Sequence, residues 1–218
     1  MSARESILSR IRERQGKRAV PVAEEREAVR AHVAAHPQSA RPRTGWDPLS
    51  RFCEQAVKLA STVDYVEALE GVPAASARYL RHSGLPLTAV CWEAFADLGW
   101  SGAGVEIAVR EARESDLVGI TGAFCAIAET GTIMTVSGPR TPAAVSLLPE
   151  THIAVVRASR IVPAMEEAWQ LLRSEVSVMP RAVNFISGPS RSADIEQTVT
   201  LGVHGPSRVH IVIVRDRP

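Results

Sequence analysis

The stretch LPLTAVCWEAFADLGWSGAGVEIAV, residues 85–109, decides the fold class of this chain. Residues 85–91 and 105–109 are short apolar runs typical of strands, and residues 92–98 between them favour a short helix. Two strands separated by a helix predict a βαβ unit, because parallel neighbours need a crossover connection.

The same alternation continues on both sides of this stretch. Asp47 is a plausible N-cap and Pro48 an N1 residue, so a helix is expected to start there. Apolar runs at 124–128 and 132–136 flank a glycine and predict a β-hairpin. Further strands are expected at 62–66, 153–157, 181–186 and 209–214, with further helices over 73–81 and from Pro163. The sequence therefore predicts an α/β fold with a Rossmann-like, mostly parallel sheet flanked by helices.

Length and charge set the domain organisation. The chain has 218 residues, 25 Lys+Arg and 24 Asp+Glu, which suggests little more than one domain and disfavours a duplex-binding protein. Residues 1–45 carry a net charge of +5 and residues 46–218 a net charge of −4. Ser2 and Glu5 fit a capping box for a helix over residues 3–16. We expect a helical arm with its linker over 1–45 and an α/β domain over 46–218. Interleaved acids favour an arm that packs on the body or on a partner over one that binds RNA or membranes.

The three cysteines, Cys53, Cys91 and Cys125, lie far apart and show no CxxC spacing. We expect them to be buried apolar side chains, with no disulfide framework and no zinc or iron–sulfur site on this chain alone. No apolar run approaches 18 residues, and the arginine-rich start lacks the apolar region of a secretory signal. The expected location is therefore the cytoplasm.

The first segment with chemical potential is Gly119-Ile-Thr-Gly122, followed by Ala128-Glu-Thr-Gly-Thr132. Partial burial of Glu129 between two apolar strands would raise its pKa and suit a general base or a nucleophile. The alternative is a glutamate at the tip of an exposed hairpin.

The second segment is Ser187-Gly-Pro-Ser-Arg-Ser-Ala-Asp-Ile-Glu196, directly after a predicted strand. Its hydroxyl groups, the N–H groups of a following helix start and Arg191 would form an anion cradle. Open α/β sheets bind ligands outside the carboxyl ends of their strands. The alternative is a plain turn with Asp194 as a cap.

The third segment is Gly202-Val-His-Gly-Pro206, just before the last predicted strand. Flanking glycines let the backbone approach a ligand and leave the His204 imidazole accessible. The alternative is a surface turn that happens to contain a histidine.

Together these blocks, with Ser146-Leu-Leu-Pro149 between them, resemble the LUD-domain family in order and spacing over residues 47–218. The resemblance implies a fold similar to the phosphosugar isomerase and CoA-transferase superfamily. It also implies a role in the oxidation of L-lactate to pyruvate beside two iron–sulfur proteins. The clusters are then expected on those partners, with no cofactor on this chain and a small carboxylate or other anion as its ligand.

One departure concerns the stretch before the Ser-Leu-Leu-Pro block, which in the family often contains glycine, glutamine and arginine. Here the nearest arginine is displaced to Arg140. The candidate catalytic residues are Glu129 and His204. The candidate ligand-binding residues are Thr121, Thr130, Gly131, Thr132, Arg140, Ser187, Gly188, Ser190, Arg191, Asp194 and Gly205.

Three functions remain open from the sequence. The first is an accessory or ligand-binding subunit of a lactate-oxidising iron–sulfur system. The second is a stand-alone enzyme, similar to CoA-transferases and isomerases, that uses Glu129 as a nucleophile. The third is an assembly protein that docks through its helical arm.

Overall fold

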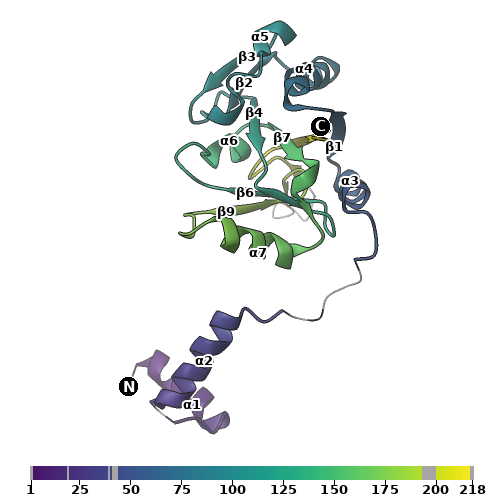
Figure 1. Ribbon diagram of the computed structural model, residues 1–218. Coiled ribbons are helices and arrows are strands. Elements are labelled where there is room, and N and C mark those ends of the chain that lie inside the picture. Colours follow the sequence, from purple (N-terminus) through teal and green to yellow (C-terminus); the bar gives the residue numbers. More distant parts are fainter. Residues whose placement is uncertain (1, 19, 39, 41–43, 193–199, 217–218) are drawn as a thin grey trace. The chain divides into compact units, whose positions relative to one another are not determined.

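The computed structural model describes the chain apart from residues 1, 19, 39, 41–43, 193–199 and 217–218. The chain divides into two compact units, residues 1–43 and 44–218. Figure 1 shows both units, and we describe each by itself.

The N-terminal unit contains two helices, α1 (Ala3–Arg14) and α2 (Ala23–Ala35). The predicted capping box forms at the start of α1. Ser2 Oγ accepts from the Glu5 N–H at 3.3 Å, and the Ser2 N–H donates to Glu5 Oε2 at 2.7 Å. Neither helix buries a residue, and the side chains of Ile7 and Ile11 on α1 are about half exposed.

The second unit is built on a parallel six-stranded sheet, which we call sheet A, with the strand order β1-β12-β7-β4-β2-β3. Its strands are β1 (Thr62–Val66), β2 (Thr88–Cys91), β3 (Glu106–Val109), β4 (Val118–Gly122), β7 (Thr151–Arg157) and β12 (Arg208–Val214). The predicted mostly parallel α/β fold is therefore confirmed.

A second sheet, sheet B, has the order β8-β5-β6-β9 and is mixed, because β5 pairs with β8 in parallel and with β6 antiparallel. Its strands are β5 (Cys125–Ile127), β6 (Thr132–Val136), β8 (Ile161–Val162) and β9 (Val183–Ile186), and β10 (Arg191–Ser192) forms a separate pair with β11 (Thr200–Leu201). The predicted hairpin is thus β5–β6, and it lies in sheet B rather than in the parallel sheet.

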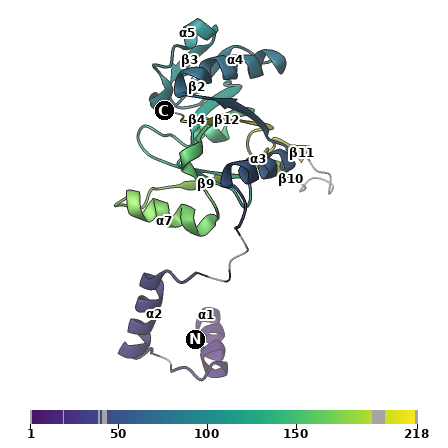
Figure 2. The ribbon, with the colours of Figure 1, turned by 45° about the vertical axis from the view of Figure 1, so that its right-hand side comes forward.

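Five helices flank the two sheets in the described part of this unit, as Figures 1 and 2 show. They are α3 (Pro48–Lys58), α4 (Val72–His82), α5 (Trp100–Ala103), α6 (Ala144–Leu147) and α7 (Met165–Glu175). Helix α4 packs on one face of sheet A with the side chains of Ile153 and Val155. The opposite face packs against α3 and sheet B through Ala154 and Ile211. Helix α7 covers the far side of sheet B, so the unit consists of successive helix, sheet, sheet and helix layers.

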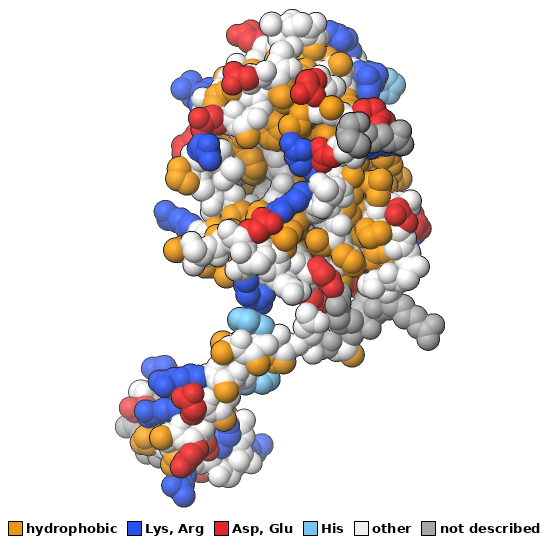
Figure 3. All heavy atoms as spheres, viewed as in Figure 1, with side chains coloured by type: hydrophobic (Ala, Val, Ile, Leu, Met, Phe, Trp, Pro, Cys, Tyr) orange, Lys and Arg blue, Asp and Glu red, His pale blue; other side chains and the backbone are white. Residues whose placement is uncertain are grey.

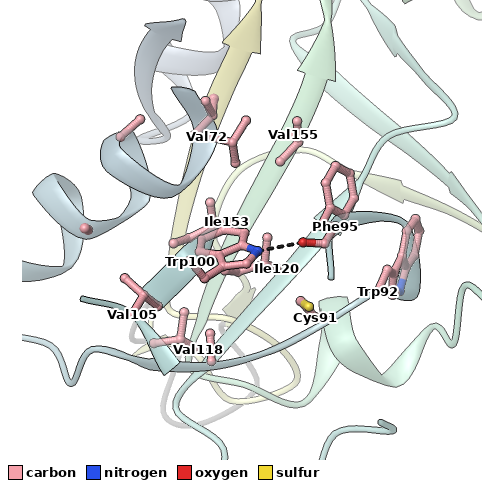
Figure 4. Packing of buried hydrophobic residues seen from close by; sticks show 14 of the residues in the cluster. Val72, Cys91, Trp92, Phe95, Trp100, Val105, Val118, Ile120, Ile153 and Val155 are labelled. Atoms are coloured by element: carbon pink, nitrogen blue, oxygen red, sulfur yellow. Dashed lines mark hydrogen bonds between the residues drawn. The ribbon is translucent and has the colours of Figure 1, made fainter. Parts of the chain in front are cut away.

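The largest apolar cluster lies between sheet A and helices α4 and α5 (Figure 4). Trp100 is 3% exposed, and its indole Nε1–H donates to the Phe95 carbonyl oxygen at 2.6 Å. A buried indole needs such a partner, since an unpaired N–H in an apolar core costs free energy. The three cysteines are buried and free, as predicted.

Several sequence predictions need correction. The helix expected at 92–98 is a single 3-10 turn, Glu93–Phe95, and the strand expected at 85–91 begins only at Thr88. Leu85 instead donates its N–H to the Leu80 carbonyl and closes the end of α4. None of the described helices combines the length and the apolar character needed to cross a membrane.

Acidic and basic side chains alternate on the face of the second unit seen in Figure 3, with apolar side chains between them. This mixture agrees with the nearly balanced charge of the whole chain. The face therefore presents no extended field of one sign.

Candidate functional site

Three hydroxyl groups from two distant motifs form a hydrogen-bonded row, which we call the hydroxyl chain, at one end of the strands β6 and β9 of sheet B. Thr130 Oγ1 lies 2.7 Å from Thr132 Oγ1, which in turn lies 2.7 Å from Ser187 Oγ. Thr132 begins β6 and is 2% exposed, whereas Ser187 follows β9 and is exposed. The antiparallel register of β6 and β9, with Ile133 opposite Ile186, brings the two motifs together.

Two glycines of these motifs allow close packing on α3. Gly131 has φ +66°, and a Cβ there would lie 2.5 Å from the Ala56 nitrogen. Gly188 has φ +75°, and a Cβ there would overlap the Leu59 carbonyl oxygen. Both positions need the left-handed backbone region and the missing side chain, which only glycine offers together. Their role in the described structure is therefore to seat the hydroxyl chain against α3.

The segments that contain Arg191 and His204 also meet. The Ser190 N–H donates to the Pro206 carbonyl at 2.8 Å, and the Gly202 N–H donates to the Ser190 carbonyl at 3.0 Å. A Cβ on Gly205 would lie 3.5 Å from the Ser190 Cβ, so the two turns pack directly on each other. The two sequence motifs, each a turn beside a strand, therefore lie together in the structure.

Arg191 is exposed and lies at the carboxyl end of α3. Its Nη2 donates to the carbonyl oxygen of Leu59, the C-cap residue of that helix, at 3.4 Å. A cation is favourable there, because the last carbonyl groups of a helix carry partial negative charge. A guanidinium has five N–H donors, and this bond, the one that Arg191 makes among the described residues, uses one of them.

The place of these turns in the fold differs from the expectation. Leu59 lies three residues before β1 and Pro206 two residues before β12, so the turns lie at the amino ends of sheet A and not at its carboxyl ends. The expected helix start after Ser187 is also wrong at residues 191–192, which form strand β10. Asp194 lies outside the described residues, and its predicted role as a ligand contact or cap stays a prediction.

In open α/β sheets, ligands commonly bind at the carboxyl ends of two neighbouring strands from which the chain continues in opposite directions. In sheet A these two strands are β2 and β4. Aromatic side chains occupy this position. A Cβ on Gly122 would lie 3.1 Å from the Phe95 ring, and the Trp92 indole donates to the Pro142 carbonyl at 3.1 Å. This position is therefore packed rather than open.

Glu129, Arg140 and His204 have different surroundings. Glu129 is half-buried in the β5–β6 turn, and its N–H donates to the Pro163 carbonyl at 2.9 Å. Glu129 thus lies in the hairpin turn with its side chain only partly covered, next to the exposed Thr130. His204 and Arg140 are exposed, and Arg140 follows the far end of β6 from Thr132. The structure therefore separates Arg140 from the hydroxyl chain.

Thr121 contacts a residue that sequence reasoning missed. Its Oγ1 lies 2.7 Å from His152 Nε2, and both side chains are completely buried. Desolvation lowers the pKa of His152 to about 4, so the imidazole is neutral near pH 7. The signal for this residue was an imidazole inside the apolar run Thr151–Arg157.

The thiols do not fit a metal or cluster site. Burial raises the pKa of Cys91 and of Cys125 to about 11, which disfavours the thiolate that metals bind. Cys91 lies in the cluster under α4, Cys53 on α3 and Cys125 under α7. Within the described residues, no three His, Cys, Asp or Glu side chains gather in a way that could hold a metal ion.

The fold and the site together define an α/β protein with a candidate site made of hydroxyl groups, one guanidinium group and backbone amides at glycine-containing turns. The chain belongs to the LUD domain family, whose model matches residues 94–214. That match includes every candidate residue from Thr121 to Gly205 but begins after β1, β2, α3 and α4.

Curated relatives and a solved structure agree with this assignment. The chain is 40% identical to lactate utilization protein C of Bacillus subtilis over 129 residues, which is 58% of this chain and 51% of that protein. It is 46% identical to lactate utilization protein C of an Exiguobacterium species over 102 residues, 45% of this chain and 44% of that protein. The chain thus spans about half the length of the curated relatives it matches.

The fold is similar to the crystal structure of a DUF162 family protein from Deinococcus radiodurans. The TM-score is 0.60 at 22% sequence identity, over 80% of this chain and all of that one. At this identity the likeness concerns the fold alone.

Proposed function

We propose that this protein takes part in L-lactate utilisation as a component that binds a small carboxylate and leaves electron transfer to iron–sulfur partner proteins. The names of its relatives support the metabolic context. The three cysteines are buried in three different apolar clusters and so offer no common ligand set for an iron–sulfur cluster. This observation is the reason for assigning electron transfer to the partner proteins.

The chemistry of the reaction sets what the partners must supply. Oxidation of a 2-hydroxy acid to a 2-oxo acid removes two electrons and two protons from the substrate. A base must take the hydroxyl proton, and Glu129 or His204 suits that role by position at a turn. The electron acceptor comes from a partner or cofactor, since none of the candidate side chains named here accepts an electron pair.

The hydroxyl chain and the Arg191 turn support an anion-binding role. Arg191 suits a bidentate contact with a carboxylate, which a lysine cannot reproduce. Ser190 and the neighbouring Gly205 turn would bring the backbone and His204 close to the same ligand. This surface also suits contact with a partner that delivers or withdraws the substrate.

The experiment is a pull-down of the tagged chain from cells grown on L-lactate, with mass spectrometry and a visible absorption spectrum of the eluate. We expect a brown eluate that contains cysteine-rich partner proteins. An R191A variant is expected to keep the partners and lose lactate-dependent dye reduction, with R191K as the charge-conserving comparison. A colourless eluate without partners would count against the proposal.

A second candidate rests on the half-buried position of Glu129 beside the Gly131 turn. In a stand-alone acyl-transfer enzyme, the Glu129 carboxylate would attack an acyl-CoA thioester, form an acyl anhydride and release the CoA thiolate. An acyl-CoA donor should then label the wild-type chain at Glu129 and leave E129Q unlabelled. Absence of label on both chains rejects this candidate.

A further inference from the structure

The two helices of the N-terminal unit lack the burial that normally stabilises short helices. Helix α1 has 12 residues and α2 has 13, and neither contains a buried residue. Isolated helices of this length are marginal in water, and most helices in proteins are stabilised by packing an apolar face. The unit also lies outside residues 94–214, the part that the LUD family model matches. Both helices therefore still have apolar surface to bury.

On α1, an apolar pair lies beside an arginine pair. Ile7 and Ile11 line one hollow together with Arg10 and Arg14. Residues three or four positions apart are neighbours on the surface of a helix, so these four side chains form one face. Ile7 is 56% exposed and Ile11 is 46% exposed. The face thus combines apolar surface with positive charge.

Helix α2 and the turn before it repeat this arrangement. Arg26, Val29 and Arg30 line a hollow of about 590 Å³. Val33 follows Val29 by one turn, and the two valines are 62% and 63% exposed. Among the described residues that line the hollow, five are basic and one, Glu25, is acidic. The five basic residues are Arg12, Lys17, Arg18, Arg26 and Arg30.

The acidic side chains near this hollow act within α2. Glu25 Oε2 accepts from the Val22 N–H at 3.2 Å at the start of the helix, and Glu27 lies 3.6 Å from Arg30. The Glu27 and Arg30 side chains are 73% and 76% exposed, and an ion pair so exposed is weak. Residues 1–45 keep a net charge of +5. The surface of α2 is therefore basic as well as apolar, and Figure 3 shows basic and apolar side chains next to each other on this unit.

The composition of this segment favours a protein partner over a nucleic acid or a membrane. Phe, Trp and Tyr stack on bases and anchor helices at a membrane surface, and residues 1–45 contain none of them. Five glutamates stand among the ten Lys and Arg residues, which weakens the attraction to phosphate groups. A second copy of the chain is disfavoured as the partner, because two segments with a net charge of +5 repel each other.

We propose that the N-terminal helices are a docking element for an acidic, amphipathic helical segment of a partner protein. Apolar side chains of that segment would cover Val29 and Val33, and its carboxylates would pair with Arg26 and Arg30. A guanidinium suits this pairing, since it binds a carboxylate through two parallel hydrogen bonds. The matching face of α1 offers a second contact of the same kind. The inference goes beyond the proposed function, because it depends on the N-terminal unit alone.

The test uses the full-length protein and a synthetic probe peptide of about 20 residues, long enough to form a helix when bound. Its leucines are spaced three and four positions apart, and glutamates flank them. Binding is followed by the fluorescence anisotropy of the labelled peptide. One control peptide has the same composition in shuffled order, and another has lysine in place of each glutamate. We expect the probe alone to bind, and less tightly in about 0.5 M salt, where charges are screened.

Two double variants separate the charge from the apolar surface. R26Q/R30Q removes the arginine pair, and V29S/V33S removes the apolar pair. Glutamine and serine have helix propensities close to those of arginine and valine, so circular dichroism of the full chain should stay unchanged. Each double variant is expected to weaken probe binding about tenfold or more.

The matched control is R113Q/R173Q, which removes the same charge from exposed positions of the second unit. It is expected to bind the probe like the wild type. Equal binding by R26Q/R30Q and R113Q/R173Q, or equal binding of the probe and its shuffled form, would overturn the proposal.

Three further outcomes would assign the helices to another partner and also overturn the proposal. Tighter binding of a single-stranded RNA than of the probe would indicate a nucleic acid. Tighter binding of phosphatidylserine-containing vesicles would indicate a membrane. Dimerisation that V29S/V33S abolishes in analytical ultracentrifugation would indicate a second copy. These results are independent of the pull-down, which tests the proposed function without the probe peptide.

Discussion

Thr132 Oγ1 lies 2.7 Å from Ser187 Oγ, although 55 positions separate the two residues along the chain. The contact joins the start of β6 to the residue that follows β9. It therefore unites the two sequence motifs that were singled out as places for chemistry.

A T132V variant tests how much this contact stabilises the domain. Valine has the same shape but cannot bond to Ser187, so the free energy of unfolding should fall by about 1 kcal/mol. Urea unfolding measures the change. T132S keeps the hydroxyl and should recover the hydrogen-bond part of the loss. Equal stability of T132V and the wild type would show that the bond contributes nothing to folding.

Gly131 should be far more sensitive to substitution than an open glycine. In G131A the new Cβ meets the backbone of α3 at a positive φ, which should cost about 2–4 kcal/mol. G102A is the control, because a Cβ on Gly102 in α5 meets nothing within 4 Å. Thermal and urea unfolding of both variants give the comparison. Similar stability of the two variants would contradict the close packing of the turn on α3.

The sequence predicted the sheet class and the hairpin because their signals are local. Apolar runs mark the strands, and Gly131 marks the turn between β5 and β6. It did not predict β4, because Gly119 and Gly122 weaken the strand pattern. The structure shows that these glycines admit α6 and the Phe95 ring, which are contacts with distant segments.

The sequence identified the segments that form the candidate site but not where in the fold the site lies. The motifs around Thr132, Ser187 and Gly205 meet in the structure, which the sequence reading did not specify. Their position at the amino ends of sheet A depends on how sheet B packs against α3, and no local pattern encodes that. Arg140 was grouped with them by resemblance alone, and the length of β6 separates it from the hydroxyl chain.

The indole of Trp100 offers a test of the cluster in Figure 4. W100F keeps most of the apolar volume but leaves the buried Phe95 carbonyl without its donor. The loss, together with a small cavity, should lower the free energy of unfolding by about 2–4 kcal/mol. Urea unfolding followed by circular dichroism measures it. A change below the error of the measurement would mean that the carbonyl finds another partner.

The two buried histidines should make the domain sensitive to acid. Desolvation lowers the pKa of His152 and of His210 from 6.5 to about 4. The unfolded chain therefore binds more protons than the folded chain between these values, so stability is complete above pH 6.5 and falls as the pH drops toward 4. Each histidine contributes at most about 3 kcal/mol to this change.

Urea unfolding at a series of pH values measures this dependence. An H210F variant keeps an aromatic ring beside Tyr79, with which His210 stacks at 3.9 Å, and should show a smaller loss on acidification. Unchanged stability between pH 7 and pH 5 would show that the two imidazoles are not buried in their neutral form.

The most direct test of the account is reconstitution of lactate-dependent dye reduction from the co-purified partners, with and without this chain. We predict that the partners alone are slow, that the wild-type chain restores the rate, and that R191A does not. Equal rates with and without the chain would contradict the proposal that this protein is a working component of lactate utilisation.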